Sequence, residues 1–181
     1  MRPTEGGTGA AAEPPLRPLE LLSELLRHGV DFVVIGGFSL AAHGVVRATK
    51  DVDIVPEPSE QNLARLMTAM QALEAEPLAL GDFQPNELLE LSVENLAAGG
   101  NWLLRTKLGR LDVMQYVHGM KSYADLRANA IVPKLPGVNP PPAFAGYEDL
   151  IAMKQAAGRE QDLRDISELE LARGDGGREA R

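Results

Sequence analysis

The sequence predicts an α+β (mixed α/β) domain: a small mixed β-sheet with helices packed mainly on one face. Apolar residues recur at helical spacing near both ends of the chain, and short β-branched runs lie between them without a regular strand–helix alternation. A chain of 181 residues that is 44% apolar is long enough for one domain with a proper core. The absence of cysteine excludes a disulfide framework, a thiolate zinc site and a thiol nucleophile.

The first elements can be placed from the leucine pattern and the glycines. Leucines at helical spacing predict a helix over 19–26, which Gly29 ends in the left-handed conformation. The run DFVVIGG predicts a buried strand that ends at its two glycines, and 38–43 is a short helical segment that stops at Gly44.

The middle of the chain predicts a second strand, a helix and a hairpin. In DVDIV, over 51–55, apolar residues alternate with aspartates. Ser59 is a good N-cap for a helix over 60–75. The run 86–98 favours a helix but would also allow a short strand, and 101–117 predicts two strands joined at Leu108-Gly109.

The end of the chain predicts a loop and two helices. The proline-rich piece VPKLPGVNPPP is a surface loop, and helices follow over 148–157 and 160–172 with Gly158 between them. We therefore expect a disordered leader over 1–17, one domain over 18–172 and a flexible tail over 173–181.

Charge and hydropathy limit the location and the partners. No apolar run approaches the roughly 18 residues of a membrane helix, and the N-terminus lacks the apolar core of a signal peptide, so we expect a cytoplasmic protein with no membrane contact. The net charge of −8 argues against broad nucleic-acid binding, which needs Lys and Arg to neutralise phosphates, although a locally basic cleft is compatible with it.

Three aspartates on two predicted strands are candidate metal ligands. Asp51 and Asp53 share one face of a strand, where their like charges are costly unless a hard cation such as Mg²⁺ binds between them. Asp112 lies between Leu111 and Val113 in a buried strand, where an ionised carboxylate needs a partner. The alternative for Asp51 and Asp53 is a strand whose acidic side faces solvent and binds no metal. If the strands are neighbours, the three carboxylates would hold two metal ions about 4 Å apart, and Asp112 would accept a proton from an attacking hydroxyl.

A glycine pair precedes these aspartates and suggests a phosphate site. Gly36 and Gly37 would let the backbone approach a phosphate, and Ser39 could add a hydroxyl donor. Arg47 and Thr49 lead into the acidic strand, where a cation would meet a triphosphate. The alternatives are a tight turn for the glycines and a loop-anchoring role for the arginine.

The histidines and aromatic residues give weaker indications. His43 is expected at a helix end or in packing. Trp102 and Tyr116 are expected in the core, although an aromatic ring near the cleft could stack on a base.

These motifs together resemble the nucleotidyltransferase superfamily related to DNA polymerase beta. The matching residues are IGG at 35–37, then, with thirteen residues in between, DVDI at 51–54, and later LDV at 111–113. The run RATKDVD resembles the variant found in small bacterial members, including AbiEii-like proteins of toxin–antitoxin and phage-defence loci. The resemblance implies the nucleotidyltransferase fold, ATP or another NTP as substrate, and Mg²⁺ or Mn²⁺ bound by Asp51, Asp53 and Asp112.

The C-terminal helices resemble the same subgroup in EDLIAMKQAAGREQDLRDISEL. The resemblance implies that Lys154 contacts nucleotide phosphate and that Asp162 and Asp165 shape the far wall of the cleft. The alternative is a structural pair between the two helices, either Lys154 with Asp162 or Arg159 with Asp165.

The leading hypothesis is an enzyme that transfers a nucleoside monophosphate from an NTP to a hydroxyl of RNA or protein. In it Asp51, Asp53 and Asp112 are catalytic, while Gly36, Gly37, Ser39, Arg47, Thr49 and Lys154 bind the nucleotide. A second hypothesis is a non-catalytic nucleotide-binding, antitoxin or regulatory module with a toxin–antitoxin partner protein. A third is a plain structural domain, which a large separation of Asp112 from Asp51 and Asp53 would favour.

Overall fold

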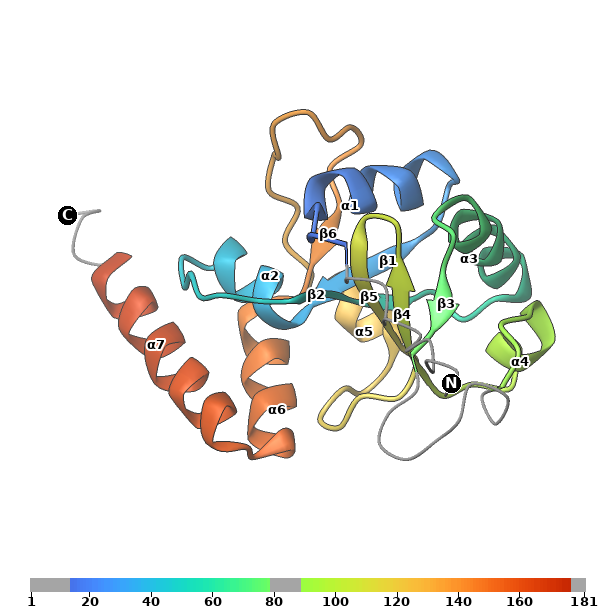
Figure 1. Ribbon diagram of the computed structural model, residues 1–181. Coiled ribbons are helices and arrows are strands. Elements are labelled where there is room, and N and C mark those ends of the chain that lie inside the picture. The colour runs from blue at the N-terminus through green and yellow to red at the C-terminus, as the bar shows by residue number, and fades with distance from the viewer. Residues whose placement is uncertain (1–13, 79–88, 177–181) are drawn as a thin grey trace, which may run out of the picture.

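A six-stranded mixed sheet forms the centre of the protein (Figure 1). The computed structural model describes residues 14–78 and 89–176. Along the sheet the strands stand in the order β3-β4-β5-β2-β1-β6. Their bounds are Phe32–Ile35 for β1, Asp51–Pro56 for β2, Glu76–Pro77 for β3, Asn101–Thr106 for β4, Gly109–Met114 for β5 and Ala143–Phe144 for β6.

The strand pairings bring the two acidic strands together. β2 runs antiparallel to β1 on one side and parallel to β5 on the other, while β4 and β5 form the predicted hairpin and β6 lies parallel to β1. The predicted fold class, a small mixed sheet with helices, is therefore confirmed. The parallel pairing of β2 with β5 is the one that positions the site.

The described part of the chain also contains seven helices: α1 Pro18–Arg27, α2 Gly36–Ala42, α3 Glu60–Ala72, α4 Val93–Ala97, α5 Tyr123–Ala128, α6 Tyr147–Ala157 and α7 Glu160–Gly176. Ser59 caps α3 as predicted, since its hydroxyl accepts a hydrogen bond from the backbone N–H of Asn62. The run 86–98, for which the sequence allowed a helix or a strand, contains the helix α4. Residues 86–88 of this run lie outside the described residues. The sequence did not predict α5, β3 or β6.

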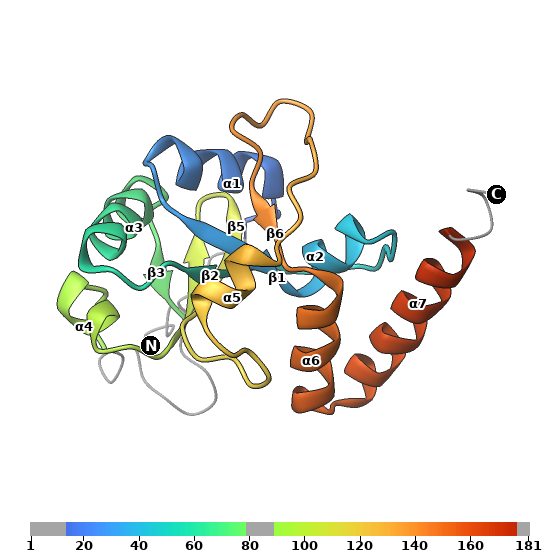
Figure 2. The same ribbon diagram turned by 180° about the vertical axis from the view of Figure 1, so that it is seen from behind.

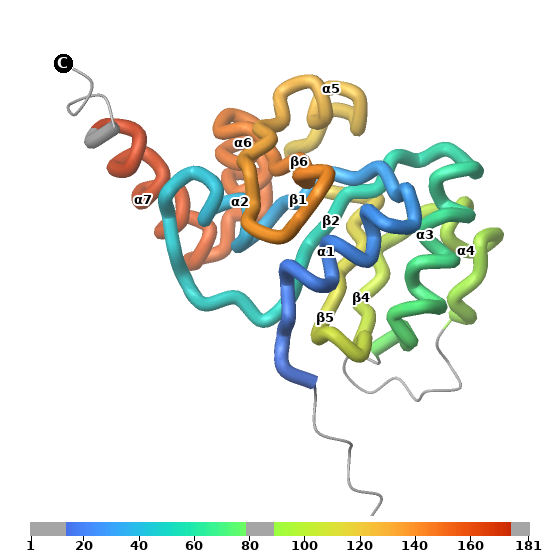
Figure 3. The backbone as a smooth tube through the Cα atoms, turned by 90° about the horizontal axis from the view of Figure 1, so that it is seen from above, coloured from blue at the N-terminus to red at the C-terminus, as the bar shows by residue number. Residues whose placement is uncertain are grey.

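Two apolar clusters fill the two sides of the sheet. Phe32 and Val34 of β1 face the cluster under α1, α3 and α4, whereas Val33 and Ile35 face the cluster formed with α2, α5, α6 and α7. The second cluster lies mainly at the β1–β6 end and also includes Val55 of β2, so helices cover both faces there (Figures 2 and 3). Beyond that end, the face of β2 and β5 opposite α1 and α3 borders a pocket instead of a helix layer.

The two ends of the domain differ in detail from the sequence prediction. Leu16 packs on the core and the backbone N–H of Arg17 donates to the carbonyl oxygen of Leu108 (2.9 Å), so the last residues of the expected leader are held in place. Helix α7 continues through 173–176, which were expected in the tail. Residues 1–13 and 177–181 lie outside the described residues. Among the described helices, none is long and apolar enough to cross a membrane.

Candidate active site

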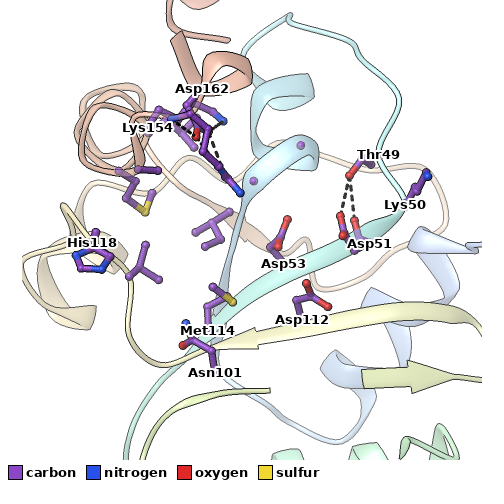
Figure 4. Close-up of a pocket in the computed structure, with 18 of the residues that line it drawn as sticks. Thr49, Lys50, Asp51, Asp53, Asn101, Asp112, Met114, His118, Lys154 and Asp162 are labelled. Carbon is purple, nitrogen blue, oxygen red and sulfur yellow. Dashed lines mark hydrogen bonds and ion pairs between the residues drawn. The ribbon is translucent and has the colours of Figure 1, made fainter. Parts of the chain in front are cut away.

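Three carboxylates from β2 and β5 point into one pocket (Figure 4). In the parallel register Asp53 stands opposite Asp112, and Asp51 stands opposite Arg110. Because side chains alternate along a strand, Asp51 and Asp53 share a face while Val52 and Ile54 are fully buried on the other. The structure therefore brings the three predicted aspartates together, which is the opposite of what a plain structural domain would require.

Burial and mutual repulsion make two of these carboxyls weak acids. Burial, and then the charges of Asp51 and Asp112, raise the pKa of Asp53 to about 7, against the opposing effect of Lys154 and Arg47. Burial and the charge of Asp51 raise the pKa of Asp112 to about 6, with Arg110 acting in the opposite direction. The site thus holds negative charge that a cation would stabilise.

Asp112 also has a carboxylate oxygen with no hydrogen bond. Its buried Oδ1 lacks a hydrogen-bond partner in the described structure, and the closest guanidinium nitrogen, Nη2 of Arg110, is 4.0 Å away. Within residues 14–78 and 89–176, no group of three or more His, Asp or Glu side chains is arranged so that it could hold a metal ion. Mg²⁺ is usually bound by one or two carboxylates together with substrate phosphates, so it does not need three protein ligands.

The glycine pair lies directly against this acidic group. Gly36, at the start of α2, has a φ of +64°, and a Cβ there would lie 2.0 Å from Oδ2 of Asp53. A Cβ on Gly37 would lie 2.9 Å from Cβ of Thr49. We expected the glycines to make room for a phosphate. In the structure the absence of a side chain at Gly36 and Gly37 makes room for Asp53 and Thr49, and the two glycines also line the pocket.

Thr49 holds one of the predicted metal ligands in place. Its hydroxyl donates to the side-chain Oδ1 of Asp51 (3.1 Å) and also lies within reach of the Asp51 backbone oxygen (3.3 Å). Thr49 lines the pocket as expected, but its hydroxyl is directed at Asp51. Its observed contact is therefore one that orients a carboxylate.

Ser39 does not take the position that the sequence suggested. It is fully buried, and its hydroxyl donates to the backbone carbonyl oxygen of Ala145 (3.2 Å), which also lies 2.9 Å from Nε2 of His43. Ser39 is not among the pocket-lining residues. The observed hydrogen bond thus holds the Ser39 side chain against Ala145, and its predicted role as a donor to a phosphate stays a prediction. His43 ends α2 and packs, as predicted.

A buried ionic cluster forms the wall of the pocket opposite the carboxylates. Lys154 of α6 contacts Asp165 (2.5 Å) and Asp162 (3.3 Å) of α7, and Arg159 contacts Asp162 (2.7 Å). Arg47 reaches Asp165 from the segment before β2, with its Nε 3.1 Å from Oδ1. The alternative of an interhelical Lys154–Asp162 pair is thus present, whereas Arg159 pairs with Asp162 and not with Asp165.

The pKa values of both α7 aspartates are lowered by these contacts. Burial alone would raise the pKa of Asp165, but the hydrogen bonds from Lys154 and Gln161 outweigh it. For Asp162 the hydrogen bond from Arg159 and the charge of Lys154 do the same. Both are therefore ionised at neutral pH, whereas Asp53, with a pKa of about 7, is only partly ionised there.

The remaining wall of the pocket carries residues that sequence reasoning missed or misplaced. The pocket has a volume of about 830 Å³, and beyond β5 it is lined by Asn101, Met114, Tyr116 and His118. Tyr116 is 64% exposed, so the expectation that it is a core residue is wrong, while Trp102 is buried as predicted. The Asn101 side chain bonds the backbone at Gln115 and Tyr116, which holds this segment at the pocket edge.

Comparison with solved structures supports the same fold. The protein is similar to ANT(2'')-Ia in a crystal structure with adenylyl-2''-tobramycin: TM-score 0.50, 12% identity, covering 89% of this chain and 95% of that one. It is also similar to a solution structure of the antibiotic-resistance factor ANT(2'')-Ia (TM-score 0.48, 13% identity, 90% and 92% covered). A third is TM1012, a nucleotidyltransferase candidate from Thermotoga maritima (TM-score 0.46, 14% identity, 93% and 99% covered).

The chain therefore has the nucleotidyltransferase fold. No family model and no curated protein sequence matches it. The narrower resemblance to AbiEii-like proteins, and with it a toxin–antitoxin partner, stays a prediction.

Proposed function

We propose that the protein is a metal-dependent nucleotidyltransferase that transfers a nucleoside monophosphate from an NTP to an acceptor hydroxyl. The observation that carries this proposal is the register of β2 and β5, which places Asp53 opposite Asp112 with Asp51 on the same face. Three carboxylates facing a pocket with Lys154 and Arg47 on the opposite wall provide separate places for cations and for phosphate.

Asp51 and Asp53 would hold the divalent cation with Asp112, because Asp112 has a buried oxygen without a hydrogen bond. Bound there, Mg²⁺ or Mn²⁺ would neutralise the charge that develops on the phosphates. Thr49 keeps the Asp51 carboxylate oriented toward this position. Gly36 lets Asp53 reach it, since any side chain at residue 36 would occupy the position of the Asp53 carboxylate.

The triphosphate would lie along Gly36 and Gly37 and toward the cations Lys154 and Arg47, all of which line the pocket. The acceptor oxygen attacks the α-phosphorus, the bond from that phosphorus to the bridging oxygen breaks, and pyrophosphate leaves. Asp112 takes the proton of the attacking hydroxyl.

The decisive experiment follows an α-labelled NTP into RNA and protein fractions in the presence of Mg²⁺. We expect labelling by the wild-type protein, and a loss of at least about 100-fold in the Asp51→Asn/Asp53→Asn double variant. Glu168→Gln is a matched control because Glu168 is an exposed carboxylate on α7 and does not line the pocket.

Undiminished transfer by the double variant would refute the assignment of the site. Tight MgATP binding without transfer to any RNA or protein would favour the alternative of a non-catalytic nucleotide-binding module.

A further inference from the structure

Asp165 joins three parts of the protein at one buried carboxylate. It is 0% exposed and accepts hydrogen bonds from Nζ of Lys154 (2.5 Å) and Nε2 of Gln161 (2.8 Å). Its Oδ1 also pairs with Nε of Arg47 at 3.1 Å. Lys154 belongs to α6, Asp165 to α7, and Arg47 to the segment between α2 and β2. One side chain therefore connects two helices to the segment that leads into the metal-binding strand.

The Arg47 side chain has one other hydrogen bond within the described residues, from Nη1 to the adjacent Ala48 carbonyl (3.1 Å). Its neighbour Val46 is 84% exposed. The views in Figures 1 and 3 both show this segment running beside α7. The ion pair with Asp165 is therefore the main constraint on where the Arg47 guanidinium lies.

The cluster carries an excess of positive charge on the pocket wall. Arg47, Lys154 and Arg159 contribute three positive charges, whereas Asp162 and Asp165 contribute two negative ones. Arg47, Lys154, Arg159 and Asp162 all line the pocket, but Asp165 does not. The three cations thus line the pocket, whereas Asp165, which pairs with Arg47 and Lys154, does not.

We propose that Asp165 is a positioning residue for triphosphate recognition, which holds Arg47 and Lys154 together on the wall that receives the phosphates. This inference rests on the proposed function, and it concerns how that site distinguishes a triphosphate from a monophosphate. If α7 moved away from α6, Arg47 and Lys154 would both lose their ion pair with Asp165. Nucleotide affinity would therefore depend on the packing of α7 against α6.

A purely structural role explains the cluster less well. A buried ion pair contributes little net stability, because desolvation of the charges offsets their attraction, and apolar residues of similar volume often serve as well. α7 already packs on the second apolar cluster through Leu169. Asp165 instead brings together two pocket-lining cations from separate elements. Such a pair of cations suits a ligand that carries several phosphates.

The test measures binding of MgATP and of AMP by isothermal titration calorimetry to wild type, Asp165→Asn and Glu168→Gln. We expect Asp165→Asn to weaken MgATP binding at least tenfold and AMP binding less than threefold, so that the ratio of the two affinities falls. Glu168→Gln should bind both nucleotides as the wild type does, because Glu168 is exposed on the same helix.

A second variant covers the case in which Asp165→Asn does not fold. Arg47 is about one-third exposed, so Arg47→Gln is expected to fold and to show the same selective loss of MgATP affinity. In the double variant the two losses should be less than additive, since both remove the same contact.

Each result separates this inference from the proposed function. A wild-type protein that binds no nucleotide would overturn both. Wild-type affinity or tighter binding of MgATP by Asp165→Asn, or by Arg47→Gln, would overturn the positioning role and leave the proposed function in place. An equal loss for MgATP and AMP would also overturn it, because general loosening of the pocket predicts that result.

Discussion

Asp53 of β2 and Asp112 of β5 face each other across a parallel strand pair, each at the same level of the sheet. Along the chain the two strands are separated by α3, β3, α4 and β4. The cluster is unfavourable in the absence of a ligand, since the charges of Asp51 and Asp112 raise the pKa of Asp53 and the charge of Asp51 raises the pKa of Asp112. Carboxyls with such raised pKa values that face a pocket mark a candidate functional site, and this is where the proposed cation would bind.

Asp112→Asn should remove catalysis while preserving the nucleotide site. The amide cannot accept a proton from the acceptor, so we expect transfer to fall at least about 100-fold. The Kd of MgATP should weaken less than transfer does, because Asp51 and Asp53 would still hold the cation, and Lys154 and Arg47 still line the pocket. Labelled transfer and calorimetry on the same preparation check this, with Glu170→Gln, an exposed residue of α7, as the control. Equal losses in transfer and in binding would contradict a role as base.

The stability of the metal-free protein should depend on the ionisation of Asp53. Its folded-state pKa of about 7 lies above the usual 3.8, so the folded state binds the proton more tightly than the unfolded state. This contribution to stability is full below about pH 4 and is lost as the pH rises through about 7. At pH 8, Asp53→Asn should therefore melt at a higher temperature than the wild type.

Thermal melts of both proteins without divalent cations, at pH 5 and pH 8, measure this effect. A gain of about 1 kcal/mol would raise the Tm by about 2–4 °C for a protein of this size. The difference should be smaller at pH 5, where Asp53 is protonated in the folded state and ionised only in the unfolded state. A wild type that is the more stable of the two at pH 8 would show that Asp53 is already neutralised by its neighbours.

Gly36→Ala should damage the site more than an alanine elsewhere at positive φ. The new Cβ would lie 2.0 Å from Oδ2 of Asp53, so the carboxylate must move, and transfer should fall at least about tenfold. Gly99→Ala is the matched control, since Gly99 has a φ of +89° and nothing within 4 Å of the added carbon. Both carry the backbone cost of about 1–2 kcal/mol, but only Gly36→Ala should lose activity. Retention of full activity by Gly36→Ala would refute the packing argument.

Ser39→Ala distinguishes the structure from the expectation based on sequence. The variant loses one buried hydrogen bond, while the Ala145 carbonyl keeps its contact with His43, so a destabilisation of about 0.5–1.5 kcal/mol is expected. The Kd of MgATP should be unchanged, because Ser39 does not line the pocket. A tenfold weaker Kd in calorimetry, with little change in urea unfolding, would show that the serine binds phosphate.

Local patterns predicted the parts of the fold that depend on residues close in sequence. The alternation in 51–55 placed Val52 and Ile54 in the core and the aspartates on the other face, and the turn at Leu108-Gly109 gave the β4–β5 hairpin. The short strands β3 and β6 were missed because two residues carry no periodicity. They are strands only because β4 and β1 pair with them.

The contacts that complete the site could not be predicted from the sequence, because they join distant segments. Nothing near Arg47 in the sequence indicates that its partner is Asp165 on the last helix. For Lys154 the sequence allowed two roles, contact with a phosphate or a structural ion pair, and did not decide between them. Tyr116 follows a buried strand, so the sequence predicts a core residue. In the structure the Asn101 side chain hydrogen-bonds the backbone of Tyr116, and the ring lies at the pocket edge. These positions are set by tertiary packing, which local propensity does not contain.

The close fit between Gly36 and Asp53 also has an evolutionary consequence. As long as the aspartate is needed, selection must keep residue 36 as glycine. A descendant that had given up catalysis and replaced Asp53 with a smaller residue would be free of the steric part of that restriction. Among natural relatives, the two positions should therefore drift together, and their joint loss would mark the lineages in which the enzyme has become something else.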